Sequence, residues 1–468
     1  MAYLWQYKLY MKLTTITISM ICFNITPLSA QTVWTMDQCM TYAVEHSTKM
    51  QSMNIRVQQA ESDYKMAKLN FLPKVNAQIN GQFSWGRNID PETNNYNNVT
   101  TFNNYYELYA SLPLFDGFAT LNSFKQARLA RSNSETALQQ SRDELAINVM
   151  QAYIDACYDY DCINLATKKL DDSNALLHKT QRLFELGEKS RPDVAQIEAQ
   201  VAEDEYNLIH QRNEWQKAIL KLKSLMNYIP KASTLSKEES TSDDTKEEMQ
   251  NITLINPYQE NRKEVDHTPL FNSGENKENV SILLASNAIR DAEYTYKIKR
   301  ADLYPSLSLE GEVGTNYYKN LSQGGNTTFG QQWHNNQGEY LVLSLHIPLV
   351  SPAVWKSVKK ARNDIALARI SLDEKRRELE DNMSEAVMDY KGYSREYSQM
   401  EKKISSDSLA YDLSYQKYEE GILSTFDLHT ASETLLQSRI KQLQIAMLLA
   451  MKQRLVEYYS GQPLIHQK

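Results

Sequence analysis

The same order of motifs occurs twice along this chain, roughly 234 residues apart. The segment "ASLPLFDGFATLNSFKQARLA" returns in the second half as "LHIPLVSPAVWKSVKKARNDIA", and "FELGEKSRPDV" returns as "YEEGILSTFDL". The last pair of motifs aligns Gly187, Ser190 and Asp193 with Gly421, Ser424 and Asp427 at one constant offset. This period is too long for a solenoid repeat, so we expect the chain to fold as two copies of one large structural unit.

Each half follows one plan. A helix of roughly 40 residues comes first, followed by two alternating strands, a long helix that ends at the matched glycine, and a shorter returning helix. Residues 231–279 are polar and charged, and we expect a linker or a small peripheral segment there. The predicted ranges are 31–230 for the first repeat, with strands at 73–88 and 104–115 and helices at 117–186 and 192–229, and 280–468 for the second repeat, with strands at 305–318 and 339–350 and helices at 352–420 and 426–459.

The first long helix constrains the shape of the molecule. Residues 117–186 contain no proline, and one helix of this length would extend roughly 105 Å, which predicts a rod. Apolar side chains recur every seven residues in both long helices, which indicates a coiled coil or a plain antiparallel bundle. These positions are Val149, Ala156, Ile163, Leu170, Leu177 and Phe184 in the first half, and Met383, Tyr390, Tyr397, Ile404, Tyr411 and Tyr418 in the second.

All four predicted strands have one apolar and one polar face. In "PKVNAQINGQFSWG", residues 73–86, apolar side chains alternate with amides, and successive strand side chains point to opposite faces. The polar face is expected to carry Asn76, Gln78, Asn80, Gln82, Glu310, Glu312 and His346. A soluble sheet would bury its apolar face against helices. A transmembrane β-barrel would instead turn that face to lipid and the polar face to a water-filled lumen.

Three features favour the barrel. The strands have about ten residues or more, the length that crosses a bilayer, and the loops between paired strands are long and polar. Aromatic residues near the strand ends suit the membrane interfaces, namely Trp85, Tyr105, Tyr106, Tyr317 and Tyr340. Four strands cannot close a barrel, and open edges are not tolerated in hydrocarbon, so the chain must oligomerise. Two copies would give eight strands and a plugged lumen, and three would give twelve and a wet pore.

The N-terminus predicts export. Residues 11–30, "MKLTTITISMICFNITPLSA", have the pattern of a secretory signal peptide with cleavage after Ala30, and residues 1–10 read as an upstream extension. A single membrane anchor is the alternative. No later stretch has about 20 consecutive apolar residues, so we expect the mature chain to leave the cytoplasm without a helical membrane span.

Composition and motifs exclude several classes of function. A net charge of −7 gives the chain little attraction for nucleic acid. The sequence contains no glycine-rich phosphate loop, HExxH motif or nucleophile elbow, and its histidines are scattered, so we expect no enzyme, no cofactor and no metal site. Cys39, Cys157 and Cys162 lack the spacing of a zinc site and are predicted to be buried free thiols.

The chain resembles the TolC family of bacterial outer-membrane efflux and secretion channels over essentially its whole mature length. The resemblance rests on "VWTMDQCMTYAVEHS", on "LPKVNAQINGQ" and "YPSLSLEGEVG", on "SLPLFDG" and "LHIPLVSP", and on the paired G-x2-S-x2-D turns. It implies a mainly α fold with a transmembrane β-barrel part. Each chain of a homotrimer would give four strands to a 12-stranded barrel in the outer membrane and long coiled-coil helices to a periplasmic α-barrel, with residues 231–279 in an equatorial collar.

The resemblance also implies partners. Outer-membrane lipid would surround the barrel, and the narrow periplasmic end would meet an adaptor (a membrane fusion protein). Through this adaptor the channel would meet an inner-membrane pump of the resistance-nodulation-division (RND) or ABC type. Conduction would be passive, in tripartite efflux or in type I protein secretion, because the pump supplies the energy and sets the substrate. The alternative from a different class is a non-channel periplasmic coiled-coil scaffold or adhesion stalk, which the lipid-length strands disfavour.

At the level of residues, the resemblance places the matched turns, with Gly187, Ser190, Gly421 and Ser424, at the periplasmic tip. Asp427 matches an entrance acid that rings the pore and favours cations, but a second acid of that family is replaced here by Thr430. Tyr418 and Asp193 match a tyrosine and an aspartate that hold the closed state, whereas the matching arginine position holds Leu423. Asp193 and Asp427 also fit helix N-caps, since each follows a turn and precedes an apolar helical run.

Overall fold

The structure is a computed structural model that describes residues 33–89, 94–228, 253–257, 279–322 and 328–465. The predicted signal peptide and most of the segment 231–279 lie outside the described residues. The described chain divides into two compact units, each of which combines parts of both sequence repeats. Unit 1 contains residues 33–47, 145–228, 253–257 and 386–465, and unit 2 contains residues 48–89, 94–144, 279–322 and 328–385.

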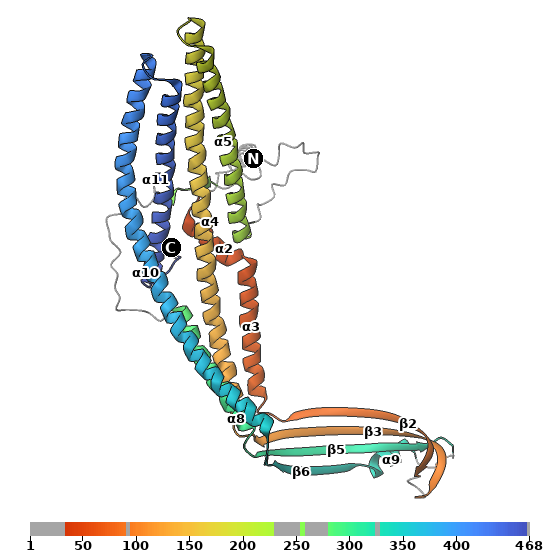
Figure 1. Ribbon diagram of the computed structural model, residues 1–468. Coiled ribbons are helices and arrows are strands. Elements are labelled where there is room, and N and C mark those ends of the chain that lie inside the picture. Colours follow the sequence, from red (N-terminus) through yellow and green to blue (C-terminus); the bar gives the residue numbers. More distant parts are fainter. Residues whose placement is uncertain (1–32, 90–93, 229–252, 258–278, 323–327, 466–468) are drawn as a thin grey trace, which may run out of the picture. The chain divides into compact units, whose positions relative to one another are not determined.

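Both repeats contain the same order of main elements (Figure 1). The first repeat contains helices α2 (Met36–His46) and α3 (Thr48–Leu69), strands β2 (Lys74–Ile89) and β3 (Tyr96–Phe115), and helices α4 (Ala119–Glu185) and α5 (Arg191–Met226). The second contains helix α8 (Val280–Ala301), strands β5 (Ser306–Asn320) and β6 (Gly338–His346), and helices α10 (Pro352–Glu419) and α11 (Thr425–Tyr459), with the short helix α9 (Phe329–Asn335) between β5 and β6.

The helix that opens each half differs from the prediction. A single helix of roughly 40 residues was expected from the pattern, but the first half has two helices that are separated at Ser47. The backbone of Ser47 is extended, with φ −67° and ψ 144°, so the hydrogen-bond ladder of α2 ends there and α3 begins at Thr48. Serine competes with the helix by bonding nearby backbone groups, which favours it at helix ends. In the second half the described opening helix, α8, has 22 residues.

The four long strands form one antiparallel sheet in unit 2, in the order β2-β3-β5-β6 (Figure 1). The register places apolar residues opposite one another across all strands, for example Leu108 opposite Val313 and Leu309 opposite Leu343. This apolar face is exposed in the chain: Ile79 is 69% exposed and Leu341 is 73% exposed. The long helices of the described chain therefore leave most of this face exposed, whereas a soluble sheet would bury it.

The core of unit 1 forms where the small sheet of β1 (Val33–Trp34) and β4 (Thr253–Leu254) meets α4. The side chain of Tyr153 is fully buried there. Its hydroxyl lies 2.9 Å from the Trp34 carbonyl oxygen and 2.6 Å from that of Ile255, and it accepts a hydrogen bond from the Ile255 N–H. Residues 253–257 of the segment 231–279 are thus tied into unit 1 by a parallel strand pair.

The predicted thiols are buried in unit 1, and the predicted apolar stripe is buried only in part. Val149 and Ala156 are fully buried and Tyr418 is 1% exposed, whereas Phe184 at the end of the stripe is 40% exposed. The prediction of free buried thiols is confirmed for Cys39, Cys157 and Cys162. Their burial raises the pKa of Cys39 to about 12 and that of Cys162 to about 11.

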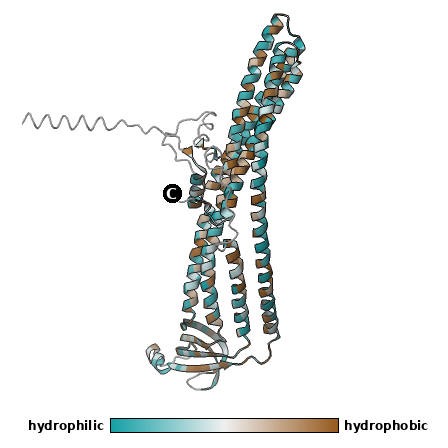
Figure 2. Cartoon of the chain, turned by 90° about the vertical axis from the view of Figure 1, so that its left-hand side faces the viewer, coloured by the Kyte–Doolittle hydropathy of each residue, from teal (hydrophilic) through white to brown (hydrophobic). Residues whose placement is uncertain are grey.

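Along the described helices, no segment is long and apolar enough to cross a membrane. Figure 2 shows why, because hydrophilic and hydrophobic residues alternate along every long helix rather than forming one apolar run.

Candidate functional site

Two interhelical turns in unit 1 carry the matched glycines. The N–H of Gly187 donates to the carbonyl of Phe184, and the N–H of Glu188 donates to that of Leu183. The second turn repeats this pattern at Gly421. These bonds form a Schellman motif, which requires a left-handed residue after the helix, and the φ angles of the two glycines are +81° and +74°. Glycine adopts this conformation without the strain that a Cβ atom would add.

Each turn is closed on its other side by a serine and an aspartate. Ser190 and Ser424 are the N-cap residues of α5 and α11, so the prediction that Asp193 and Asp427 are themselves N-caps is wrong. Both aspartates occupy the third helical position instead. The carboxylate of Asp193 accepts bonds from the N–H and the hydroxyl of Ser190, at 3.0 and 2.6 Å, and that of Asp427 accepts one from the Ser424 hydroxyl at 2.7 Å. Serine caps because its short side chain reaches the free N–H groups of the first turn, and the following acid complements them.

Asp193 also links the two helical hairpins, α4–α5 and α10–α11. The hydroxyl of Thr425, a residue only 4% exposed, donates to the second carboxylate oxygen of Asp193 at 3.1 Å. The pKa of Asp193 is lowered, first by the two bonds from Ser190, then by the bond from Thr425 and by the nearby charge of Lys189. Asp193 is therefore ionised at neutral pH and connects both turns.

Tyr418 makes a second link between the hairpins. Its hydroxyl lies 3.1 Å from that of Thr180 on α4, and both residues are buried. The ammonium of Lys189 lies 4.2 Å from the centre of the Tyr418 ring, within the range of a cation–π contact. Tyr418 and Asp193 thus lie in one cluster, but each bonds a threonine of the opposite hairpin. We call Thr180, Lys189, Asp193, Tyr418 and Thr425 the turn cluster.

An ion pair extends the link along α4 and α10. Lys179 binds Glu419, which raises the pKa of the lysine and lowers that of the glutamate. Both side chains are 41% exposed, so we expect this pair to contribute little on its own. Sequence reasoning missed Lys179, Thr180, Lys189 and Thr425. Their partners lie far away along the chain, and no local pattern marks them.

A cavity of about 260 Å³ lies between the hairpins next to the turn cluster. Its lining includes Lys169, Asp172, Glu203 and His429. Lys169 is 9% exposed and binds the hydroxyl of Ser432 across the hairpins, while the Nδ1 atom of His429 is buried without a hydrogen-bond partner. Among the described residues, no three His, Cys, Asp or Glu side chains are grouped as a metal site would require.

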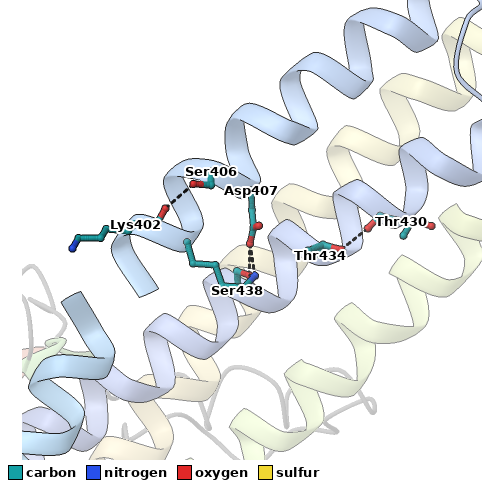
Figure 3. A network of polar contacts seen from close by, with 7 residues as sticks. Lys402, Ser406, Asp407, Thr430, Thr434 and Ser438 are labelled. Carbon is teal, nitrogen blue, oxygen red and sulfur yellow. Dashed lines mark hydrogen bonds and ion pairs between the residues drawn. The ribbon is translucent and has the colours of Figure 1, made fainter. Parts of the chain in front are cut away.

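Within each hairpin, a serine and an aspartate join the two helices. In the first, the Ser173 hydroxyl on α4 binds buried Asp204 on α5. In the second, the aspartate is on the long helix: Asp407 on α10 accepts from Ser438 on α11 at 2.6 Å (Figure 3). Lys403 also bonds Asp407, and this bond is the main cause of the lowered pKa of that carboxyl group.

The predicted polar-face residues lie on one face of the sheet. The ladder pairs Gln78 with Glu107 and Glu312 with Tyr340, whose hydroxyl donates to the glutamate at 2.5 Å. By register, the same face carries Asn76, Gln78, Asn80, Gln82, Glu310, Glu312 and His346. The prediction of aromatic interface residues needs correction, because Tyr105 and Tyr340 lie on this polar face. Trp85, Tyr106 and Tyr317 lie on the apolar one, since side chains alternate along a strand.

Comparison with known proteins identifies the family. The model of the outer membrane efflux protein family matches residues 41–228 and 269–457. The chain belongs to the outer membrane efflux protein family. The TolC resemblance is thus confirmed, and the match spans both repeats. No functionally curated protein matches the sequence.

Solved structures show the same fold at low identity. The CmeC outer membrane channel of Campylobacter jejuni has a TM-score of 0.72 at 14% identity, covering 91% of this chain and 85% of that one. The outer membrane protein VceC of Vibrio cholerae gives 0.69 at 13%, covering 91% and 96%. The open state of the MtrE outer membrane channel of Neisseria gonorrhoeae gives 0.66 at 16%, covering 91% and 88%. This efflux protein therefore has the predicted fold class, mainly helical with a TolC-like four-stranded part.

Proposed function

We propose that three copies of this chain form a channel across the outer membrane. The single observation that carries the proposal is the sheet of unit 2, which has an exposed apolar face, a polar face and two open edges. Unpaired backbone groups at an edge cost several kcal/mol each in hydrocarbon, so the edges formed by β2 and β6 must pair with other copies. Three sheets would close one 12-stranded barrel, wide enough for a water-filled lumen.

In this channel the polar face lines the lumen. Amide and carboxylate side chains such as Gln78 and Glu312 would stay hydrated there, while Leu341 and Leu343 would face lipid. The helices would extend into the periplasm and receive substrates from an adaptor and an inner-membrane RND or ABC pump. The family match supports efflux. Conduction through the channel would be passive, with the energy supplied by the pump.

The two turns would form the periplasmic entrance, and the turn cluster would hold it closed. Thr180, Tyr418, Asp193 and Thr425 join the two hairpins of one chain, so separating the hairpins would break these bonds. Asp427 is exposed beside the turn, and three copies around a pore axis would form a carboxylate ring that attracts cations. Gly187 and Gly421 allow the tight reversals that this entrance needs.

Single-channel recording in a planar bilayer tests the proposal. The detergent-purified protein should give stable conductance steps with a preference for cations. Asp427→Asn should reduce that preference while keeping an oxygen to accept the Ser424 bond. Glu374→Gln, which removes an exposed charge from α10, serves as the control for net charge. A protein that stays monomeric and soluble without detergent would overturn the channel, whereas unchanged selectivity would overturn only the role of Asp427.

A further inference from the structure

Helix α9 follows β5 in a segment that the sequence presents only as a polar loop. It begins at a capping box in which the Thr328 hydroxyl accepts from the Gln331 N–H, and the Gln331 side chain accepts from the Thr328 N–H. Phe329 and Trp333 are four residues apart, so they share one side of the helix. The remaining side chains of α9 are mostly amides and one histidine. The helix is therefore amphipathic despite its short length.

The aromatic side of α9 packs on the apolar face of the sheet. The Trp333 ring lies 4.9 Å from that of Tyr106, and the Phe329 ring lies 5.3 Å from that of Tyr317. By register, Tyr106 and Tyr317 share a face with Leu108 and the other apolar strand residues. Helix α9 thus lies on the side of the sheet opposite the lumen residues.

Hydrogen bonds fix the helix in this place. The β5–β6 ladder ends where Gly314 pairs with Gly338, so the β6 side of β5 continues beyond its partner strand. The side chain of Gln332 accepts from the Tyr318 N–H at 2.7 Å and donates to the Tyr318 carbonyl at 2.8 Å, as a neighbouring strand would. Asn336 donates to the Asn316 carbonyl at 2.8 Å. Residues of the loop therefore complete the edge of the sheet.

The level of α9 along the strands matches a membrane interface. From Leu307 to Tyr317, β5 extends about 33 Å at about 3.3 Å per residue, which becomes roughly 25 Å across a membrane at a tilt near 40°. That is about the height of the apolar band of an outer-membrane barrel. At this end the apolar face also carries two basic residues, Arg87 and Lys319. An acid on the same face, Glu339, pairs with Val313 and so lies nearer the middle of β5.

We propose that α9 is an interfacial anchor that binds the outer leaflet at the level of the lipid headgroups. Phe329 and Trp333 remain 48% and 38% exposed after packing on the sheet, and amphipathic aromatic rings are favoured at this level. Arg87 and Lys319 would meet the anionic groups of the lipid. The inference rests on the proposed function, since it requires that the apolar face contacts lipid. It adds that the second outer loop is held outside the barrel wall rather than over the lumen.

Tryptophan quenching in proteoliposomes tests this placement. The difference in fluorescence between the wild type and Trp333→Phe isolates Trp333. Quenchers are a lipid with a headgroup nitroxide, a lipid with a mid-chain nitroxide, and soluble acrylamide. We expect the headgroup nitroxide to quench Trp333 several-fold more than either of the others. Leu343→Trp, at a mid-strand position 61% exposed on the apolar face, is the lipid control, and Tyr206→Trp, at a position 66% exposed on α5, is the aqueous control.

The outcomes separate the two proposals. Acrylamide quenching of Trp333 would place α9 in water and overturn the anchor. Protection of Trp333 from all three quenchers would also overturn it, in favour of a contact with another copy of the chain. If the mid-chain nitroxide does not quench the tryptophan of Leu343→Trp, the apolar face of the sheet does not contact lipid. That outcome would overturn the proposed channel as well as the anchor.

Discussion

Removing one hydroxyl group from the turn cluster should open the channel. In Tyr418→Phe the ring keeps its packing and its contact with Lys189, and only the bond to Thr180 is lost. Thr180 is fully buried and Tyr418 is 1% exposed, so water has little access to replace the lost partner. A buried hydroxyl without its partner costs about 1–3 kcal/mol, and this cost falls on the closed arrangement alone.

The magnitude follows from the number of chains. With the lower value of about 1 kcal/mol in each chain, three entrances that open together lose about 3 kcal/mol of closed-state stability. Because about 1.4 kcal/mol is a factor of ten, the ratio of open to closed channels should rise roughly a hundredfold. Thr180→Val combined with Tyr418→Phe leaves two apolar groups facing each other. Replacing both partners is nearly neutral, so the double variant should open less often than Tyr418→Phe alone.

The assay is the fraction of time that single channels spend open in a planar bilayer. Each variant must first migrate as the same detergent-stable oligomer as the wild type, which separates gating from misfolding. An unchanged open fraction in Tyr418→Phe would refute the assignment of this bond to the closed state. A double variant that opens more than the single one would show that the two hydroxyls do not act as a pair.

Three further predictions concern the turns and the thiols. Gly421→Ala should destabilise its turn by about 1 kcal/mol, because φ is +74° there. Gly392→Ala should instead stabilise helix α10 by about the same amount, because alanine favours a helix interior over glycine. Hydrogen exchange of each segment measures both effects. The pKa of Asp193 is lowered, so its links are intact above the ordinary carboxyl pKa of about 4 and are lost as pH falls through the lowered value. The contribution of Asp193 to the closed state should therefore be constant between pH 5 and 7, and the difference in open fraction between the wild type and Asp193→Asn should be the same at both pH values. Burial raises the pKa of Cys39 to about 12, so maleimide should modify it at least about a hundredfold more slowly in the native protein than after unfolding, as mass spectrometry would show.

The sequence predicted the parts of the fold that a regular pattern encodes. Side chains that alternate along residues 73–86 specify a strand whatever it pairs with, and a proline-free heptad stretch specifies a long helix. The internal repeat then related the halves, and the family match and solved structures confirmed the fold class. The break at Ser47 was not predictable in the same way, because one residue with an extended backbone leaves the helical pattern on both sides unchanged.

Contacts between distant segments could not be predicted. The repeat marked Asp193 and Asp427, but it could not show that Asp193 binds Thr425 of the other hairpin, because this contact depends on how two helix pairs lie side by side. Helix α9 was hidden for a different reason. Its two aromatic residues occur among amides and glycines, and only the apolar face of the sheet gives them a partner.

The repeat also preserves contacts whose residues have changed. Ser173 and Asp204 occupy the positions that Asp407 and Ser438 occupy in the second half, so the bond within each hairpin is retained with its two partners exchanged. The bonds between hairpins lie where α4–α5 packs against α10–α11, and each chain has one such interface. In a ring of three chains, a second interface of the same kind forms between the α10–α11 hairpin of one chain and the α4–α5 hairpin of its neighbour. The repeat offset relates Asp193 to Asp427 and Thr425 to Arg191. The pair Asp193 and Thr425 within a chain therefore corresponds to Asp427 and Arg191 between chains, an acid and a base.

We therefore expect Arg191 of one chain to bind Asp427 of its neighbour in the closed channel. This pair would separate on opening, which would leave the ring of Asp427 carboxylates free to attract cations. Both side chains are exposed in the single chain, as the residues of an unformed interface should be. An exposed pair of this kind contributes up to about 1 kcal/mol, so position is a sharper test than stability. Arg191→Cys combined with Asp427→Cys should form disulfide-linked dimers and trimers on a denaturing gel under oxidation. Glu198→Cys with Asp427→Cys, two turns further along α5, should not. Equal cross-linking of both pairs, or of neither, would mean that the interface between chains does not repeat the one within a chain.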